Sequence, residues 1–276
     1  MALNHRPRYC GPLRAIIFDW AGTTVDHGSL APVAVFIEVF ARRGVHVSAE
    51  QARAPMGLAK VDHIRVLAAL PTVAEQWRQR HGRAWNEIDI SAMYAESIGL
   101  QVACVAEYAT LIPGALSTVE HCRARGMGIG SSTGYSRTIM QVLAPAAAEQ
   151  GYCPDALVCT SDVPAGRPAP WMALQNAMQL GIYPLAAAVK VGDTVPDIAE
   201  GLNAGMWTIG LSRSGSALGL SYDDALALPA HELHLRLGAI SAELYTAGAH
   251  FVVESIAEIP AVLDIIDECL RRGEAP

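Results

Sequence analysis

Positive charge is scarce in this chain. Only 17% of its 276 residues are charged, and 20 Lys and Arg residues face 27 Asp and Glu residues, which gives a net charge of −7. A surface of that sign repels nucleic acids and anionic membranes, so we expect neither as a partner. An anionic substrate therefore needs a local binding device, such as a metal ion, an arginine or a helix N-terminus.

The chain also lacks the cysteine pairs that are typical of zinc sites and disulfide frameworks. Its six cysteines are scattered, and none forms a Cys-x-x-Cys pair. No apolar run has the length needed to cross a membrane, and residues 1–14 lack the apolar segment of a signal peptide. We therefore expect a soluble, cytoplasmic protein with reduced thiols.

Lysine is almost absent, because only Lys60 and Lys190 interrupt a chain that otherwise uses arginine as its cation. A lysine that is retained in such a chain is a candidate for chemistry that needs an amine, which can lose its proton and attack a carbonyl. The alternative is that a lysine remains by chance, and we favour that alternative for Lys190.

Short β-prone runs alternate with helical stretches along most of the chain. This alternation predicts an α/β fold, a doubly wound parallel sheet with helices on both faces and a Rossmann-like core. The predicted strands are Ala15–Phe18, Met127–Gly130, Ala156–Cys159, Ala188–Val191, Trp207–Leu211 and His250–Val253.

The segment between the first two strands contains no convincing strand. It reads as successive helices at Val33–Arg43, Ala49–Arg53, Lys60–Leu70, Val73–Arg80 and Ile88–Tyr108. We therefore predict a helical cap domain at 28–111, inserted into a core domain at 1–27 and 112–276, with hinges near His27–Pro32 and Thr110–Gly114. Ser212–Ser221 reads as a surface loop before a helix at Ala230–Ala247.

Two of the predicted strands deliver acids at their carboxyl ends. Asp19 follows the first strand, and Asp193 and Asp197 follow Ala188–Val191. Open α/β sheets bind ligands at this edge, and clustered carboxylates there favour a Mg²⁺ site. The alternatives are a turn-forming Asp19, and an Asp cap with a solvated helix residue at the second site.

Two further motifs are suited to binding an anion. Hydroxyls and backbone N–H groups at Gly130–Tyr135, which includes Thr133, Gly134 and Tyr135, can cradle an anion or cap a helix. The prolines of Gly166–Trp171 hold Arg167 where it can clamp a phosphoryl group, unless it is a solvated loop residue.

The order of these four motifs resembles that of the haloacid dehalogenase superfamily. Its phosphatases carry Asp-x-Asp-Gly-Thr, whereas this chain reads Asp19-Trp20-Ala21-Gly22-Thr23. The second acid of that motif protonates an alkoxide leaving group, and Ala21 cannot do so. The backbone carbonyl of Ala21 remains available as a metal ligand.

A lysine in the predicted cap offers a different leaving group. The neutral amine of Lys60 can condense with an aldehyde, and the resulting iminium lets a C–P bond break to give an enamine. Burial would keep part of this amine neutral. His63 lies on the same helix face and is a candidate proton relay. The alternatives are a surface lysine and a packed or solvated histidine.

With this lysine the whole chain resembles the phosphonoacetaldehyde hydrolases, a family of the haloacid dehalogenase superfamily. The matching motifs span core, cap and tail: Asp19–Asp26, Met56-Gly57-x-x-Lys60-x-x-His63, Thr133–Tyr135, Gly166–Trp171, Gly192–Thr194 and Gly248–Phe251. Some members carry Cys at Ser29 and an aromatic residue at Ala169, so these two positions depart from the pattern.

The resemblance implies Mg²⁺-dependent hydrolysis of phosphonoacetaldehyde to acetaldehyde and phosphate, in the degradation of 2-aminoethylphosphonate. It implies a Schiff base on Lys60, nucleophilic attack by Asp19, and metal binding by Asp19, the Ala21 carbonyl, Asp193 and Asp197, the last directly or through water. Phosphonate and substrate contacts would come from Met56, Gly57, Thr133, Gly134, Tyr135 and Arg167. Family members are homodimers that associate through the cap.

Three other functions are compatible with part of this sequence. A phosphomonoester phosphatase or mutase of the same superfamily is disfavoured by Ala21. A non-catalytic binding module is disfavoured by the joint presence of Asp19, Lys60 and Asp193. An aldolase that uses Lys60 alone would leave the acidic motifs without a role.

Overall fold

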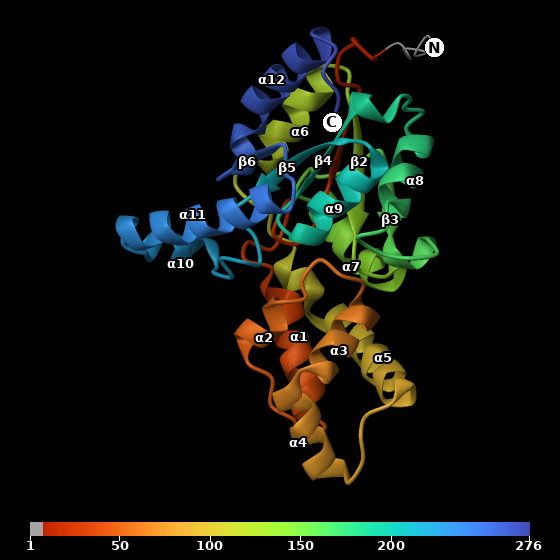
Figure 1. Cartoon of the computed structure of the whole chain (residues 1–276), viewed down its shortest axis with the longest axis vertical. Helices are drawn as coiled ribbons and strands as arrows, with labels where there is room; N and C mark the ends of the chain where they lie inside the picture. Colours follow the sequence, from red (N-terminus) through yellow and green to blue (C-terminus); the bar gives the residue numbers. More distant parts are fainter. Residues whose placement is uncertain (1–7) are drawn as a thin grey trace, which may run out of the picture.

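The core is a single parallel sheet, as the sequence predicts. The structure, a computed structural model, describes residues 8–276, so part of the N-terminal segment discussed above lies outside the described residues. Six strands, all parallel, run in the order β3-β2-β1-β4-β5-β6 (Figure 1). They are β1 (Ala15–Phe18), β2 (Gly128–Thr133), β3 (Ala156–Cys159), β4 (Ala188–Gly192), β5 (Trp207–Leu211) and β6 (Phe251–Val253).

Helices cover both faces of this sheet, so β1 at its centre is buried on both sides. In β1, Ile16 and Phe18 belong to one apolar cluster, whereas Ala15 and Ile17 belong to another. The first face is covered by α6 (Ala115–Ala124), α7 (Arg137–Ala148) and α12 (Ile259–Arg271). The second is covered by α8 (Trp171–Gln179), α9 (Val195–Ala204) and α11 (Ala230–Thr246), and α10 (Tyr222–Ala227) packs beside α11.

A separate helical body, called the cap here, lies beyond the sheet (Figure 1). It has its own apolar core, which includes Phe36, Phe40, Trp77 and Met93, and Trp85 packs against it. Both tryptophans therefore serve in packing. The cap comprises α1 (Leu30–Ala41), α2 (Ala49–Arg53), α3 (Lys60–Ala69), α4 (Pro71–His81), α5 (Glu87–Cys104) and the 3₁₀ turn η1 (Val105–Tyr108).

The first cap helix begins at Leu30 rather than at the predicted Val33. The Asp26 carboxylate accepts hydrogen bonds from the backbone N–H groups of Leu30 (3.0 Å) and Ala31 (3.1 Å). It thereby satisfies donors that have no partner within the helix. Pro32 is tolerated because it lies in this first turn.

Two connections join the cap to the core, and they lie side by side. The Ile112 N–H donates to the Thr24 carbonyl (2.9 Å), and the Asp26 N–H donates to the Thr110 carbonyl (3.2 Å). Val25 and Leu111 form an antiparallel bridge between them. The chain thus leaves and re-enters the core through a short two-stranded ribbon.

One cap segment contradicts the prediction that no apolar run in the chain is long enough to cross a membrane. By length and composition, the helical segment Glu87–Tyr108, with a mean hydropathy of 1.2, is long and apolar enough to cross a membrane. The prediction that no such run exists is therefore wrong. Its apolar residues include Ile90 and Met93, which are buried in the cap core where α5 packs against α1 and α3.

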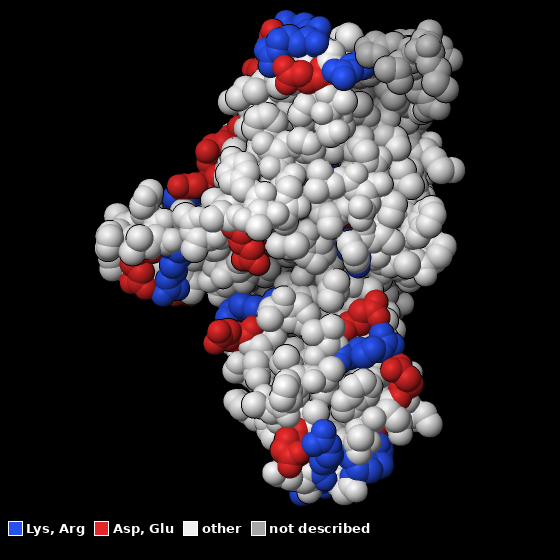
Figure 2. All heavy atoms as spheres, in the orientation of Figure 1, with Lys and Arg blue, Asp and Glu red and all other residues white. Residues whose placement is uncertain are grey.

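The low charge content is visible on the molecular surface. Figure 2 shows a broad uncharged face over the core. Charged side chains gather at the end of the core away from the cap, along the projection formed by α10 and α11, and on the cap. No single-sign patch dominates this face.

Candidate active site

The carboxyl ends of β1 and β4 place two acids next to each other. Phe18 pairs with Val191 in the sheet, and the Asp19 N–H donates to the Val191 carbonyl (3.0 Å). Asp193 follows two residues after Val191, and its carboxylate accepts hydrogen bonds from the Thr23 hydroxyl (3.1 Å) and the Ser216 N–H (2.9 Å). The two acidic motifs of the sequence therefore meet at one edge of the sheet.

A third acid, Asp197, completes a cluster of buried carboxylates. One oxygen from each of Asp19, Asp193 and Asp197 lies within 4.8 Å of the others. Burial, followed by the charges of Asp19 and Asp197, raises the pKa of Asp193 to about 7. Burial also raises the pKa of Asp19, against the opposing charge of Arg167. Carboxylates that crowd together in this way gain from a bound cation.

Asp197 differs from the other two because it is already paired. Its Oδ1 lies 2.7 Å from Lys190 Nζ and 3.0 Å from Arg167 Nη1. Burial alone would raise the pKa of Asp197, but the charges of Arg167 and Lys190 lower it below its usual range. Lys190, which seemed a chance retention in the sequence, is fully buried within this network.

Arg167 connects the three carboxylates around it. Its Nη2 donates to Asp19 Oδ1 (2.8 Å), its Nε donates to Glu200 Oε2 (2.9 Å), and its Nη1 lies near Asp197. The side chain is 1% exposed, so it is not the solvated loop residue of the alternative interpretation. The charges of Asp19, Asp197 and Glu200 raise the pKa of Arg167 well above its ordinary value, against the effect of burial.

The buried charges at this edge do not balance among themselves. Four carboxylates face three cations, Arg167, Lys190 and the mostly protonated Lys60, and Glu200 Oε1 is buried with no hydrogen-bond partner among residues 8–276. A divalent cation would offset that excess, and oxygen ligands are those that hard cations prefer. The residues therefore fit a metal ion, with carboxylate oxygens available from Asp19, Asp193 and Asp197.

The turn after Asp19 is shaped by a glycine. Gly22 has φ +84°, and a Cβ atom there would lie 2.8 Å from Asp193 Oδ2. Any side chain at this position would displace the carboxylate of Asp193, one of the candidate metal ligands. Ala21, one residue earlier, lines the cavity described below and brings only a methyl group to it.

Lys60 begins α3 and lies over the sheet edge in a buried position. Its Nζ is 4.9 Å from the centre of the Tyr135 ring and 5.4 Å from that of Phe36. Burial, partly offset by the charge of Asp19, lowers the pKa of Lys60 to about 8. About one amine in ten is then neutral at pH 7, far more than for an exposed lysine. The surface-lysine interpretation is therefore wrong.

His63 lies one helical turn after Lys60 and is fully buried. Its ring stacks on Phe36 with centroids 3.9 Å apart, and its Nε2 lies 2.9 Å from the Ala52 carbonyl. Burial and the nearby Lys60 charge lower the pKa of His63 well below its usual value. The neutral ring with its proton on Nε2 donates to Ala52 and leaves the Nδ1 lone pair free of any partner in residues 8–276.

A small cavity of about 20 Å³ lies between cap and core and is lined by most of the predicted site residues. His63, Asp193 and Asp197 do not line it. Gly57, with φ +89°, brings the cap loop so near the core that a Cβ atom would meet Thr194 Oγ1 at 2.3 Å. The cavity lining contains Asp19, Ala21, Met56, Gly57, Lys60, Thr133, Gly134, Tyr135 and Arg167, together with Ser29, Pro32, Leu58 and Thr194.

The Thr133–Tyr135 segment is set by the end of β2. Thr133 Oγ1 accepts a hydrogen bond from the Tyr135 N–H (3.1 Å), and the Tyr135 hydroxyl accepts one from Gln101 Nε2 (3.3 Å). Gly134 lies under the cap, where a Cβ atom would be 3.1 Å from the Leu58 carbonyl oxygen. Cap residues thus meet Gly134 and Tyr135 of this predicted anion cradle.

Sequence reasoning missed a group of supporting residues. The loop at Ser212–Ser221 is not a free surface loop, because Ser214 and Ser216 are buried; Ser214 donates to the Gly22 carbonyl (2.7 Å), and Ser216 binds Asp193. Glu200 follows Asp197 by three residues, which places both on one face of α9. The spacing of Asp197 and Glu200, and the presence of Lys190 in the otherwise apolar β4, are the sequence features that could have revealed Glu200 as part of the site.

Comparison with known proteins places this arrangement in context. The haloacid dehalogenase-like hydrolase family matches residues 13–205. The chain is 53% identical over 268 residues to a phosphonoacetaldehyde hydrolase of Syntrophobacter fumaroxidans (strain DSM 10017 / MPOB), which covers 97% of each chain. It is 46% identical over 256 residues to a phosphonoacetaldehyde hydrolase of Bacillus thuringiensis (strain Al Hakam), covering 93% of this chain and 97% of the relative.

A solved structure is similar over its full length. The phosphonoacetaldehyde hydrolase-like protein from Oleispira antarctica matches with a TM-score of 0.98 and 40% sequence identity, and the match covers all of both chains. The agreement includes the cap as well as the sheet, since no part of this chain is left unmatched.

Proposed function

We infer the reaction from the premise that this chain belongs to the haloacid dehalogenase-like hydrolases and, among them, to the phosphonoacetaldehyde hydrolase family. It is a hydrolase that cleaves the C–P bond of phosphonoacetaldehyde to give acetaldehyde and phosphate. The observation that carries this function is the buried Lys60 amine, which lines the same small cavity as Asp19, while Ala21 stands where the phosphatase motif has its second acid.

The first step uses the neutral amine of Lys60. The amine attacks the aldehyde carbon, and loss of water leaves an iminium between Lys60 and the substrate. Burial prepares this step because it lowers the pKa of the amine to about 8. The iminium nitrogen then accepts the electron pair of the C–P bond, so that carbon can leave as an enamine rather than as a carbanion.

The second step uses the Asp19 carboxylate. Asp19 attacks phosphorus as the C–P bond breaks, and the electron pair of that bond passes into the enamine. The enamine gains a proton at carbon and is hydrolysed to acetaldehyde, which frees Lys60. Water then hydrolyses the aspartyl phosphate and regenerates Asp19. No alkoxide leaves in this sequence, so an acid at Ala21 is not needed.

We propose Mg²⁺ as the metal ion, held by Asp19, the Ala21 carbonyl and Asp193. When bound, it supplies positive charge that lets one anion approach another. Asp197 is engaged by Arg167 and Lys190, which favours a supporting position over direct coordination. Arg167, Thr133 and Gly134 would hold phosphonate oxygens, with Tyr135, Met56 and Gly57 around the substrate. His63, through its free Nδ1, would accept and return protons near Lys60.

We also propose that residues 28–111 act as a cap domain on a core of 1–27 and 112–276. A cavity of about 20 Å³ is too small for the substrate to enter by diffusion, so the cap must open and close in each cycle. Free thiols at all six cysteines agree with a reducing, cytoplasmic location, which cell fractionation can check.

Borohydride trapping tests the function directly. With phosphonoacetaldehyde present, reduction of the iminium should inactivate the enzyme irreversibly and add the mass of a reduced substrate or product fragment to Lys60. Peptide mass spectrometry locates the adduct, and enzyme treated with borohydride alone is the control. An adduct on Lys190, or no adduct, would contradict the Schiff-base mechanism.

The pH dependence should follow the Lys60 amine. Because the neutral amine reacts and its pKa is about 8, kcat/KM should rise about tenfold per pH unit below that value and level off above it. The measurement is kcat/KM between pH 6 and 9.5 at saturating Mg²⁺. A profile that falls across this range, or stays flat, would contradict the role of the amine.

We propose a homodimer that associates through the cap. Helix α5 leaves Ile88 79% exposed, and the small residues Ala92, Ala95 and Gly99 are exposed on the same helix. Light scattering should give twice the 29.3 kDa mass of the chain, and Ala95→Arg should give a monomer. A wild-type mass of one chain would refute the dimer.

A further inference from the structure

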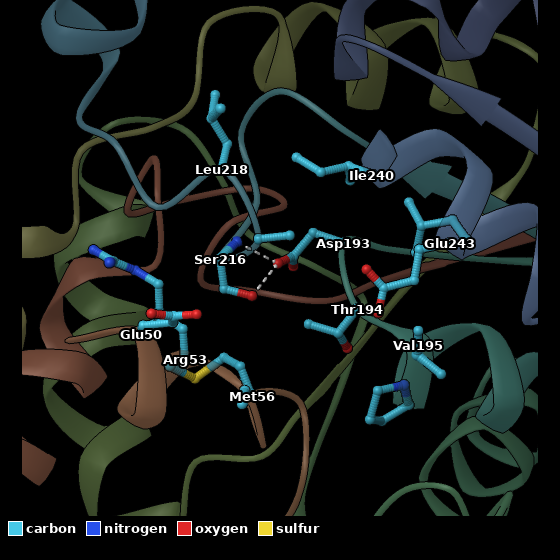
Figure 3. Close-up of a pocket in the computed structure, with 14 residues that line it drawn as sticks. Glu50, Arg53, Met56, Asp193, Thr194, Val195, Ser216, Leu218, Ile240 and Glu243 are labelled. Atoms are coloured by element: carbon cyan, nitrogen blue, oxygen red, sulfur yellow. Dashed lines mark hydrogen bonds between the residues drawn. The ribbon is translucent and has the colours of Figure 1, made fainter. Parts of the chain in front are cut away.

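A second, larger cavity borders the carboxylate cluster. It has a volume of about 390 Å³ and lies between α2 of the cap, the first turn of α9, α11 and the loop that carries Ser216 (Figure 3). We call it the Glu243 pocket, after one of the acids on its wall; Glu50, Arg53 and Asp193 also line it. Met56 and Thr194 line both this pocket and the smaller cavity that contains Lys60, so the two spaces are neighbours.

The charged side chains of the Glu243 pocket favour a cation. Three carboxylates, Glu50, Glu243 and Asp193, face it, against the single guanidinium of Arg53. Arg53 Nη2 donates to the Gly219 carbonyl (2.8 Å). Glu50 and Glu243 are exposed, and in the described part of the chain neither takes part in an ion pair. The two rim acids thus remain available to attract a cation from solution.

The other walls of the pocket are apolar and strengthen this attraction. Leu218 and Ile240 lie on the wall opposite Met56, and Figure 3 shows the carboxylates of Asp193 and Glu243 pointing into the space between these walls. A cleft with charges of one sign and walls of low dielectric focuses the electric field and raises the local concentration of counter-ions. An anion such as phosphate would be repelled by the same field.

The two cavities differ in size. The cavity that holds Lys60 lies beneath the cap and measures about 20 Å³, whereas the Glu243 pocket measures about 390 Å³ in the same structure. Asp193 borders only the larger one. We propose that the Glu243 pocket is the route by which a divalent cation reaches the Asp193 carboxylate, and that this route remains open while the cap is closed over the substrate.

This inference rests on the proposed metal role, and its test uses metal binding rather than turnover. Mn²⁺ serves as the probe, and its association is followed in a stopped-flow instrument by quenching of the fluorescence of tryptophans such as Trp20, which follows Asp19. In the double variant Glu50→Gln/Glu243→Gln we expect association at low ionic strength to slow by about tenfold. The difference from wild type should shrink at high salt, because screening removes the attraction.

A matched control separates this local effect from that of net charge. Glu120→Gln/Glu149→Gln makes the same change in net charge at two exposed positions in and after the helices on the other face of the sheet, and should leave the rate unchanged. A second variant, Ala217→Trp, places a large side chain at an exposed position of the pocket lining. It should slow both association and dissociation of Mn²⁺ while the equilibrium Kd stays within about twofold.

The outcomes distinguish the route from the metal site itself. Unchanged association rates in both pocket variants, with Mn²⁺ still bound, would overturn the route and leave the metal site intact. Absence of Mn²⁺ binding to the wild-type protein would instead overturn the proposed metal role, and with it the reason for a route. Slower rates confined to the pocket variants would support the proposal.

Discussion

Replacing Lys60 with Arg should abolish turnover of phosphonoacetaldehyde. The change keeps a cation in the cavity but removes the only group there that can become a neutral amine, because a guanidinium does not deprotonate in a protein. We expect a loss of about 10⁴-fold or more in kcat, the size that is usual when a nucleophile is removed. Acetaldehyde release, coupled to NADH oxidation by an alcohol dehydrogenase, measures the loss.

Two further variants show whether the loss is chemical. Arg65→Lys, in the same helix, makes the reverse exchange at a partly exposed position and should retain activity within about twofold. Lys60→Leu should be as inactive as Lys60→Arg but at least as stable as the wild type, because a buried amine with a lowered pKa destabilises the fold. Turnover by Lys60→Arg above a tenth of the wild-type rate would refute the role of the amine.

Replacing Asp19 with Asn should stop phosphate release without stopping Schiff-base formation. Asn has the shape of Asp but is a poor nucleophile, so we expect phosphate release to fall by about 10³-fold or more. The Lys60 iminium forms before Asp19 acts, and borohydride should therefore still attach a substrate fragment to Lys60 in this variant. A phosphate assay measures phosphate release, and peptide mass spectrometry detects the fragment attached to Lys60.

The interpretation of this second result depends on Arg167, which loses one of its carboxylate partners in the Asp19→Asn variant. Thermal unfolding should accompany the assays, so that a loss of structure is not mistaken for a loss of chemistry. Asp162→Asn, which weakens a surface pair with Arg137, is a matched control with little expected effect on either readout. Normal phosphate release by Asp19→Asn would contradict nucleophilic catalysis by Asp19.

The sequence predicted the sheet well because buried parallel strands are short apolar runs followed by turns. The largest error was at β2, which continues through Ser131, Ser132 and Thr133, where the prediction ended at Gly130. These hydroxyl residues resemble a turn, yet Ser131 and Ser132 are fully buried, and the Ser132 hydroxyl donates to Glu200 Oε2 (3.1 Å). A partner 68 residues away compensates for the burial of the Ser132 hydroxyl, and no local pattern reveals it.

The lack of a local pattern for contacts between distant residues also explains which parts of the candidate site were missed. The strand ends that carry Asp19 and Asp193 follow from the topology of a parallel sheet, so their meeting could be expected. The pairing of Arg167 with Glu200, and of Ser216 with Asp193, depends on how loops and helices pack around that edge. Such contacts between distant segments leave no periodic signal in the sequence.

The ribbon at Thr24–Asp26 and Thr110–Ile112 restricts how the cap can move. Two strands joined by backbone hydrogen bonds bend and twist readily, but they resist stretching and sliding past each other. Cap opening should therefore be a swing about this ribbon, with the Val25–Leu111 bridge retained in both positions. Lys60 would then travel along one fixed arc and return to the same point above Asp19 in every cycle. The ribbon, rather than the cap loops, would therefore determine how accurately Lys60 is positioned relative to Asp19.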